Sequence, residues 1–173
     1  MLTNLKNKKV TVMGIGVHGG GIGAIKFLVK EGAKVCATDL RDEKALASAL
    51  EQLNGLAVRF VLGKHKKEDF INADLIIKNP GVPLSSPWLA IAREQGVTIS
   101  SDICLFVERN PAFTIGITGT KGKSTTSSLI AHILKSAGIN VFLAGNIRKS
   151  VLDILPDIKE DSVVVLEFSS WQL

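Results

Sequence analysis

Aromatic side chains are scarce in this sequence: they make up 5% of the residues, and tyrosine does not occur. Surfaces that bind nucleic acid usually combine stacking aromatic rings with clustered cations. Here the 21 lysines and arginines are scattered, with one cluster at residues 64–67, and the net charge is +5. We therefore expect no nucleic-acid partner, and we interpret the positive charge as solvated surface, including His65 within that cluster.

Cysteines and long apolar runs are also rare. Cys36 and Cys104 lie far apart, without metal-ligand spacing and each in an apolar segment, which predicts two buried thiols in a reducing compartment. No apolar run approaches the length of a membrane span, and residues 1–9 are too polar for a secretory signal. We therefore expect a cytoplasmic protein with no membrane partner. Its 46% apolar residues are enough for a buried core.

A glycine-rich loop follows the first apolar segment. Residues 9–13 predict a strand, residues 14–19 read Gly-Ile-Gly-Val-His-Gly, and helical periodicity follows at residues 22–29. The spacing matches Gly-x-Gly-x-x-Gly, and Asp39 ends the next predicted strand, residues 34–38. The position of Asp39 favours NAD. The same residues also fit any other nucleoside diphosphate. Alternatively, the glycines form a turn that binds no ligand and only lets the helix pack on the strand.

The pattern of strand and helix continues to residue 110. Further strands are predicted at residues 56–62, 74–78 and 97–100, and helices at 42–53, 86–96 and 102–109. Asn79, Pro80 and Gly81 form a loop at the carboxyl end of a strand, where α/β sheets bind ligands, although such a loop can equally be a plain turn. Five alternating strands predict a Rossmann-like, doubly wound parallel sheet in a first domain, residues 1–110.

A second strand, loop and helix begin at residue 113. Residues 113–117 predict a strand, and a helix follows in which Leu129, Ile130, Ile133, Leu134 and Ala137 form the expected buried stripe. The connecting loop is Gly119, Thr120, Lys121, Gly122, Lys123, Ser124 and Thr125. Such a loop binds phosphate through backbone N–H groups and the lysine, and its hydroxyl can bind Mg²⁺. Its glycines are shifted by one from Gly-x4-Gly-Lys-Ser/Thr, so a strand-to-helix turn without a ligand is the alternative.

Glu167 stands at the end of the apolar strand predicted for residues 162–168. Nucleotide enzymes hold Mg²⁺ with a carboxylate at this position beside a phosphate loop, although a glutamate without a role is the alternative. A strand at 140–144 and a short helix at 151–155 complete this region. Three strands are too few for a whole nucleotide-binding domain, so we expect residues 111–173 to be the start of a P-loop α/β ATP-binding domain in a truncated chain.

Together, the two loops and the last residues resemble the Mur ligases, which are ATP-dependent amino-acid ligases of peptidoglycan synthesis. Residues 116–125 are similar to that family's own phosphate loop, shifted glycines included. Residues 167–173, Glu-Phe-Ser-Ser-Trp-Gln-Leu, look like the corresponding segment of the members that add D-glutamate, and residues 102–106 agree. The resemblance spans all 173 residues.

The resemblance implies that the first domain binds UDP-N-acetylmuramoyl-L-alanine and no NAD. The glycine loop would approach the diphosphate, Asp39 and Arg41 the uridine end, and the loop at residue 79 the rest of the ligand. The family usually has Ser or Thr at position 18 and a hydroxyl residue at position 40, where this chain has His18 and Leu40. The implied substrate-binding residues are Gly14, Gly16, Val17, His18, Asp39, Arg41, Asn79, Pro80, Gly81 and Asn146.

It also implies ATP and Mg²⁺ as cofactors of the second domain. The substrate's alanyl carboxylate would become an acyl phosphate, which the amine of D-glutamate then attacks. Residues 119–125 would bind ATP, Ser124 and Glu167 the metal, and Lys123, Glu167 and Asn146 would be catalytic. The rest of the metal site, the adenine contacts and a C-terminal domain that receives D-glutamate would lie beyond Leu173, so we expect no ligase activity from these residues alone.

Three alternatives remain at this point. The first is an NAD(P)-binding Rossmann protein, supported by the glycine fingerprint and Asp39. The second is a nucleotide-sensing binding module without an enzymatic reaction. The third is a different Mur ligase, one that adds L-alanine or a diamino acid. The sequence does not address the oligomeric state.

Overall fold

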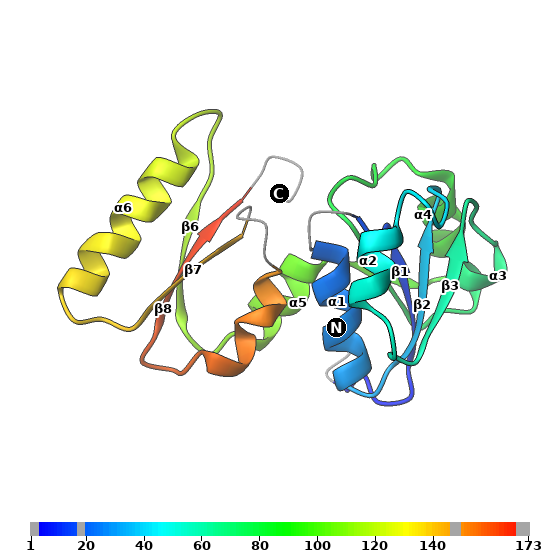
Figure 1. Cartoon of the computed structure of the whole chain (residues 1–173), viewed down its shortest axis with the longest axis horizontal. Helices are drawn as coiled ribbons and strands as arrows, with labels where there is room; N and C mark the ends of the chain where they lie inside the picture. The colour runs from blue at the N-terminus through cyan, green and yellow to red at the C-terminus, as the bar shows by residue number, and fades with distance from the viewer. Residues whose placement is uncertain (1–3, 17–19, 146–149, 169–173) are drawn as a thin grey trace.

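Two parallel β-sheets organise the computed structural model, which describes residues 4–16, 20–145 and 150–168 (Figure 1). The first sheet has the order β3-β2-β1-β4-β5, and the second has the order β6-β8-β7. Every pair of neighbouring strands is parallel. The strands are β1 (Lys9–Met13), β2 (Lys34–Asp39), β3 (Val58–Leu62), β4 (Leu75–Lys78), β5 (Thr98–Ser100), β6 (Phe113–Ile117), β7 (Val141–Gly145) and β8 (Val163–Glu167). The predicted α/β fold with parallel sheets is confirmed.

Helices connect the strands close to the predicted positions, except that α3 was not predicted. They are α1 (Gly20–Lys30), α2 (Ala47–Gln52), α3 (Glu68–Ile71), α4 (Pro87–Glu94), α5 (Asp102–Arg109) and α6 (Lys123–Ser136), with two 3-10 turns, η1 (Val151–Asp153) and η2 (Leu155–Asp157). The helix predicted for residues 42–53 begins only at Ala47, because residues 43–46 form turns. The one predicted for residues 151–155 is replaced by the two 3-10 turns, with Pro156 in the second.

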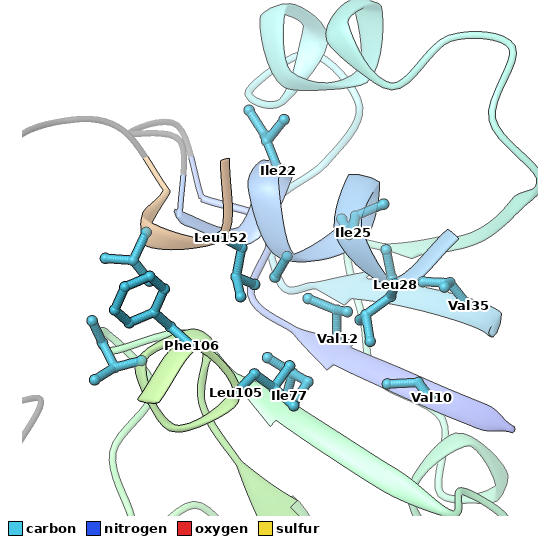
Figure 2. Close-up of a cluster of buried hydrophobic side chains, with 14 of the residues drawn as sticks. Val10, Val12, Ile22, Ile25, Leu28, Val35, Ile77, Leu105, Phe106 and Leu152 are labelled. Carbon is cyan, nitrogen blue, oxygen red and sulfur yellow. The ribbon is translucent and has the colours of Figure 1, made fainter. Parts of the chain in front are cut away.

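The strand order places a crevice between β1 and β4. Helix α1 buries Ile22, Ile25 and Leu28 against Val10 and Val12 on one face of the first sheet (Figure 2). A second cluster, which includes Phe70 of α3 and Leu89 of α4, covers the opposite face. The chain reverses direction across the sheet after β3, so β2 and β4 lie on opposite sides of β1. In such sheets ligands bind at this reversal, beyond the carboxyl ends of the strands.

The second sheet joins the first through one hydrophobic core. Turn η1 packs on both α1 and α5, and Leu152 belongs to the same cluster as Ile22 and Phe106 (Figure 2). A β-carbon on Gly23 of α1 would overlap the side chain of Ser150, so the missing side chain lets the two segments approach closely. The crevice and the loop after β6 are therefore parts of one packed structure.

Helix α6 faces its sheet with a different side from the one predicted. Ser127 and Ala131 are buried, whereas Leu129 and Ile133 are each 56% exposed, so the prediction of a buried stripe through these two residues is wrong. The sheet beneath α6 has only three strands among the described residues, too few to cover the full apolar width of the helix. The edge strand β6 likewise leaves Phe113 70% exposed.

The two cysteines differ. Cys36 is buried as predicted, whereas Cys104 is exposed, because α5 turns Ile103, Leu105 and Phe106 toward the core and Cys104 away from it. In the part of the chain that the structure describes, we find no helix with both the length and the apolar character that a membrane crossing requires.

Candidate nucleotide-binding site

The glycine loop, residues 14–19, begins directly after β1. Gly14 and Gly16 have φ values of +88° and +72°, a left-handed conformation that glycine adopts without strain. A β-carbon at Gly14 would lie 2.9 Å from Cβ of Asn79, and one at Gly16 would lie 3.1 Å from Nδ2 of Asn79. The backbone of this loop therefore passes close to the loop after β4. Val17 and His18, both predicted site residues, lie outside the described residues.

Asp39, at the end of β2, fixes the glycine loop. Its Oδ2 accepts hydrogen bonds from the N–H groups of Ile15 at 2.9 Å and Gly16 at 3.4 Å, and from Arg41 Nη2 at 2.8 Å. Its Oδ1 accepts from the backbone N–H and from Nε of Arg41, both at 3.0 Å. The carboxylate therefore ties the loop after β1 to the segment after β2.

These hydrogen bonds also set the ionisation of Asp39, which is 5% exposed. Burial by itself raises the pKa of this carboxyl, but the hydrogen bonds from Arg41 and Ile15, with the positive charge of Arg41, outweigh it. The pKa of Asp39 therefore lies below its ordinary value, and the group is a carboxylate at neutral pH.

The loop after β4 completes the crevice. The backbone N–H of Asn79 donates to the carbonyl of Met13 at 2.9 Å, which holds this loop against the end of β1. The Oδ1 atom of Asn79 accepts from the N–H of Gly81 at 3.1 Å, and its carbonyl accepts from Val82 at 2.9 Å. Asn79 thus folds its own loop into a turn and fills the space that the glycines leave open.

A cavity of about 470 Å³ opens between these three loops. Six predicted substrate-binding residues line it, while Pro80 lines a much smaller neighbouring space. The lining residues are Met13, Gly14, Gly16, Asp39, Leu40, Arg41, His65, Asn79, Gly81, Val82, Pro83, Ser86, Pro87 and Trp88. The structure therefore brings together predicted residues that are up to 67 positions apart in the sequence, from Gly14 to Gly81.

His65 and Trp88 are cavity residues that sequence reasoning missed. We expected His65 on the surface because it stands among lysines, but it is only 9% exposed. Its ring lies edge-on to those of Phe70 and Trp88, with centroid distances of 5.5 and 5.6 Å. Trp88 stands in the first turn of a predicted helix, and its position in the sequence does not indicate that it lines a cavity.

The lysine loop, residues 119–125, connects β6 to α6. Gly122 is the N-cap of α6 with φ +75°, and Gly119 has φ +144°, so both glycines adopt backbone conformations that other residues avoid. Nζ of Lys123 donates to the carbonyl of Gly119 at 2.8 Å across the loop. Residues 118–122, Ser124 and Thr125 are exposed. The lysine loop is thus exposed and leads into the start of a 14-residue helix, whose first backbone N–H groups have no partner within the helix. Such an arrangement can bind an anion.

Glu167 lies behind this loop at the end of the central strand β8. It is 2% exposed, and its Oε2 accepts a long hydrogen bond, 3.5 Å, from Ser127 Oγ. The same hydroxyl lies 3.2 Å from the carbonyl of Ser124. Among the described residues this long hydrogen bond is the one that the Glu167 carboxylate accepts, and a buried carboxylate in such a position can serve as a cation ligand. Among residues 4–16, 20–145 and 150–168, no three His, Cys, Asp or Glu side chains form a metal cluster, and Asn146 falls outside these ranges.

The fold and the two loops define an α/β protein with parallel sheets and a crevice at the strand reversal. Comparison with known families specifies it further. The model of the Mur ligase MurD-like N-terminal domain matches residues 8–101, and the Mur ligase middle-domain model matches residues 117–173. The chain belongs to the Mur ligase family.

Individual relatives agree with this assignment. The UDP-N-acetylmuramoylalanine--D-glutamate ligase of Roseiflexus sp. is 45% identical over 169 residues, which cover 98% of this chain and 36% of the relative. The enzyme of the same name from Treponema pallidum is 43% identical over 98% of this chain and 32% of its own length. The chain thus spans about a third of the length of these curated relatives.

A solved structure supports the fold. It is the UDP-N-acetylmuramate:L-alanyl-gamma-D-glutamyl-meso-diaminopimelate ligase of Neisseria meningitides, with a TM-score of 0.55 and 18% identity over 93% of this chain and 52% of that protein. At this identity the likeness concerns the fold alone.

Proposed function

We propose that this chain forms the UDP-sugar-binding domain, residues 1–110, and the first part of the ATP-binding domain, residues 111–173, of a ligase that adds D-glutamate to UDP-N-acetylmuramoyl-L-alanine. One observation carries the proposal: three loops far apart in the sequence surround a single cavity at the strand reversal of a MurD-like domain. The names of the relatives supply both substrates. The reaction is a step of peptidoglycan synthesis.

In this proposal the cavity holds the uridine diphosphate end of the substrate. Because Gly14 and Gly16 line the cavity without side chains, the backbone of the glycine loop can approach a diphosphate closely. Arg41, which shares the Asp39 carboxylate with the glycine loop, adds a cation beside that loop, and its side chain is 41% exposed. Asp39 acts by fixing Ile15, Gly16 and Arg41 in place.

The same contacts disfavour the NAD alternative. A dinucleotide site uses the acid at the end of the second strand to bind the ribose hydroxyls. A carboxylate offers about four lone-pair sites, and those of Asp39 already meet five N–H groups of the protein. Asp39 therefore has little capacity left for a ribose, although its sequence position matches the dinucleotide rule.

The lysine loop would bind ATP in the second domain. Transfer of the γ-phosphoryl group to a carboxylate brings two anions together, so positive charge has to be supplied around them. Lys123 would exchange its hydrogen bond with the Gly119 carbonyl for one with phosphate, and the N–H groups of residues 122–125 would face the same oxygens. Bound Mg²⁺ would neutralise charge on the transferring phosphoryl group. Ser124 and Glu167 would hold this ion.

Isothermal titration calorimetry of the 173-residue chain tests the substrate assignment. We expect UDP and UDP-N-acetylmuramoyl-L-alanine to bind with a stoichiometry of one, and NADH to give no saturable heat. Among nucleotide sugars, a preference for the form that already carries L-alanine indicates the D-glutamate-adding reaction. A preference for UDP-N-acetylmuramate would favour an L-alanine ligase, and one for the dipeptidyl form would favour a diamino-acid ligase.

The lysine loop requires a separate test. We expect Lys123→Met to abolish any binding of Mg²⁺-ATP or inorganic phosphate to the chain and to leave UDP binding unchanged. Lys135→Met, on the last turn of the same helix, is the matched control and removes the same charge away from the loop. Equal loss of binding in both variants would indicate a general charge effect and would contradict the proposed role of the loop.

A further inference from the structure

Three aromatic rings pack together beside the cavity, and two of them line it. His65, from the segment after β3, lies edge-on to Phe70 of α3 and to Trp88 of α4, and the Phe70 and Trp88 centroids are 5.4 Å apart. Phe70 is fully buried, Trp88 is half-buried, and both His65 and Trp88 line the cavity. We call these three residues the aromatic cluster. Because Phe70 packs behind Trp88, the indole ring has a firm support.

A buried hydrogen bond connects this cluster to the end of β2. Oγ1 of Thr38 lies 2.7 Å from Nδ1 of His65, and Thr38 is completely buried. Thr38 directly precedes Asp39, whose carboxylate fixes the glycine loop. The position of the aromatic cluster and the position of the diphosphate-binding loop are therefore set by two consecutive residues of one strand.

The ionisation of His65 fits this arrangement. Burial lowers the pKa of His65, and the negative charge of Asp39 opposes that shift only in part. The imidazole is neutral at pH 7, so Nδ1 can accept the hydrogen of the Thr38 hydroxyl. A neutral, fixed ring packs against Trp88 without placing a buried charge beside it.

We propose that the aromatic cluster binds the nucleobase, with Trp88 contacting the planar ring of the base and His65 acting as a positioning residue through Thr38. This inference rests on the proposed binding of a uridine diphosphate sugar to the cavity. The cavity is lined both by the closely approaching backbone of Gly14 and Gly16 and by the aromatic side chains of His65 and Trp88. That pairing fits the two chemically different ends of a nucleoside diphosphate, because aromatic side chains stack on any base.

Tryptophan fluorescence tests the contact. The chain has two tryptophans, so Trp171→Phe leaves Trp88 as the single emitter. We expect UDP to change the emission of this variant with the same dissociation constant that calorimetry gives, and inorganic pyrophosphate, which lacks a base, to leave the emission unchanged. If calorimetry shows UDP binding without an emission change, the proposed cavity function survives and the aromatic cluster has no contact with the base. If neither method detects UDP, both proposals fall.

Substitutions test the positioning role. Trp88→Leu should weaken UDP binding roughly 5- to 160-fold, which corresponds to the free energy of base–aromatic stacking, whereas Trp88→Phe should retain most of the affinity. Thr38→Val removes the hydroxyl at nearly constant volume and should weaken UDP several-fold, and Thr38→Ser, which restores the hydroxyl, should recover it. His132→Gln, an exposed residue of α6, is the remote control. Wild-type affinity in Trp88→Leu, or failure of Thr38→Ser to exceed Thr38→Val, would overturn the inference.

Discussion

Asp39→Ala should destabilise the unliganded chain by an amount that follows from its contacts. The substitution leaves the Ile15 N–H without a partner at a position where the backbone is buried. Such an unpaired donor costs about 1–3 kcal/mol. The Arg41 ion pair adds less than about 1 kcal/mol, because a largely exposed guanidinium is well screened by water. We expect a total loss of about 1–4 kcal/mol in the free energy of unfolding.

Arg41→Ala separates the two contributions. It removes the guanidinium from Asp39 and keeps the hydrogen bonds from the glycine loop, so it should cost less than about 1 kcal/mol. Urea denaturation followed by circular dichroism measures both variants against the unmodified chain. Equal stability of Asp39→Ala and the unmodified chain, or equal losses in the two variants, would show that Asp39 does not fix the glycine loop.

The pH dependence gives an independent check on Asp39. The pKa of Asp39 is lower in the folded chain than in the unfolded one. Its contribution to the free energy of unfolding is therefore fully present above about pH 4, the ordinary pKa of an Asp side chain. This stabilising contribution disappears as the pH falls through the lowered pKa that Asp39 has in the folded chain. The stability difference between the unmodified chain and Asp39→Ala should therefore be constant from pH 5 to 7 and shrink below about pH 4. A difference that grows toward acid would refute the assignment.

Further predictions concern the glycine loop, the thiols and helix α6. Gly14→Ala should abolish UDP binding in calorimetry, because the new methyl group would lie 2.9 Å from Asn79 Cβ in a left-handed backbone. Cys104 should react rapidly with a thiol reagent at pH 8 and Cys36 slowly, because burial, reinforced by Asp69, raises the pKa of Cys36 to about 11. Leu129→Ser should change the free energy of unfolding by less than about 0.5 kcal/mol, since its side chain is already exposed.

Matched controls make these predictions discriminating. Gly55 has φ +78° and no atom within 4 Å of an added β-carbon, so Gly55→Ala introduces similar backbone strain and should leave UDP binding intact. Leu28 is completely buried, and Leu28→Ala should cost about 2–5 kcal/mol. If Leu129→Ser were as damaging as Leu28→Ala, the exposed face of α6 would have to be a packed surface. Thiol labelling at equal rates would contradict the burial of Cys36.

The periodicity of apolar residues was sufficient to predict the parallel α/β fold. Val10 and Val12 alternate with residues of the opposite face, and the glycines at positions 14 and 32 mark where the chain leaves a strand or a helix. These signals are local, so a single sequence contains them. The family resemblance rested on equally local motifs, and the family models confirm it.

The burial of individual side chains depended on contacts that local patterns do not encode. His65 stands between lysines, yet the Thr38 hydroxyl and two aromatic rings hold it inside the structure. Leu129 has helical spacing typical of a buried stripe, yet the three-stranded sheet does not reach it. The binding and catalytic roles predicted for individual residues stay predictions, and Asn146, Val17 and His18 also lie outside the described ranges.

A nuclear magnetic resonance titration of the ¹⁵N-labelled chain with UDP-N-acetylmuramoyl-L-alanine tests the central claim most directly. We predict saturable shifts concentrated on the amides of Gly14, Gly16, Arg41 and Gly81 and on the indole N–H of Trp88, with no comparable shifts from NADH. Shifts produced at these same positions by NADH and not by the nucleotide sugar would contradict the account, as would sugar-dependent shifts confined to residues away from the cavity.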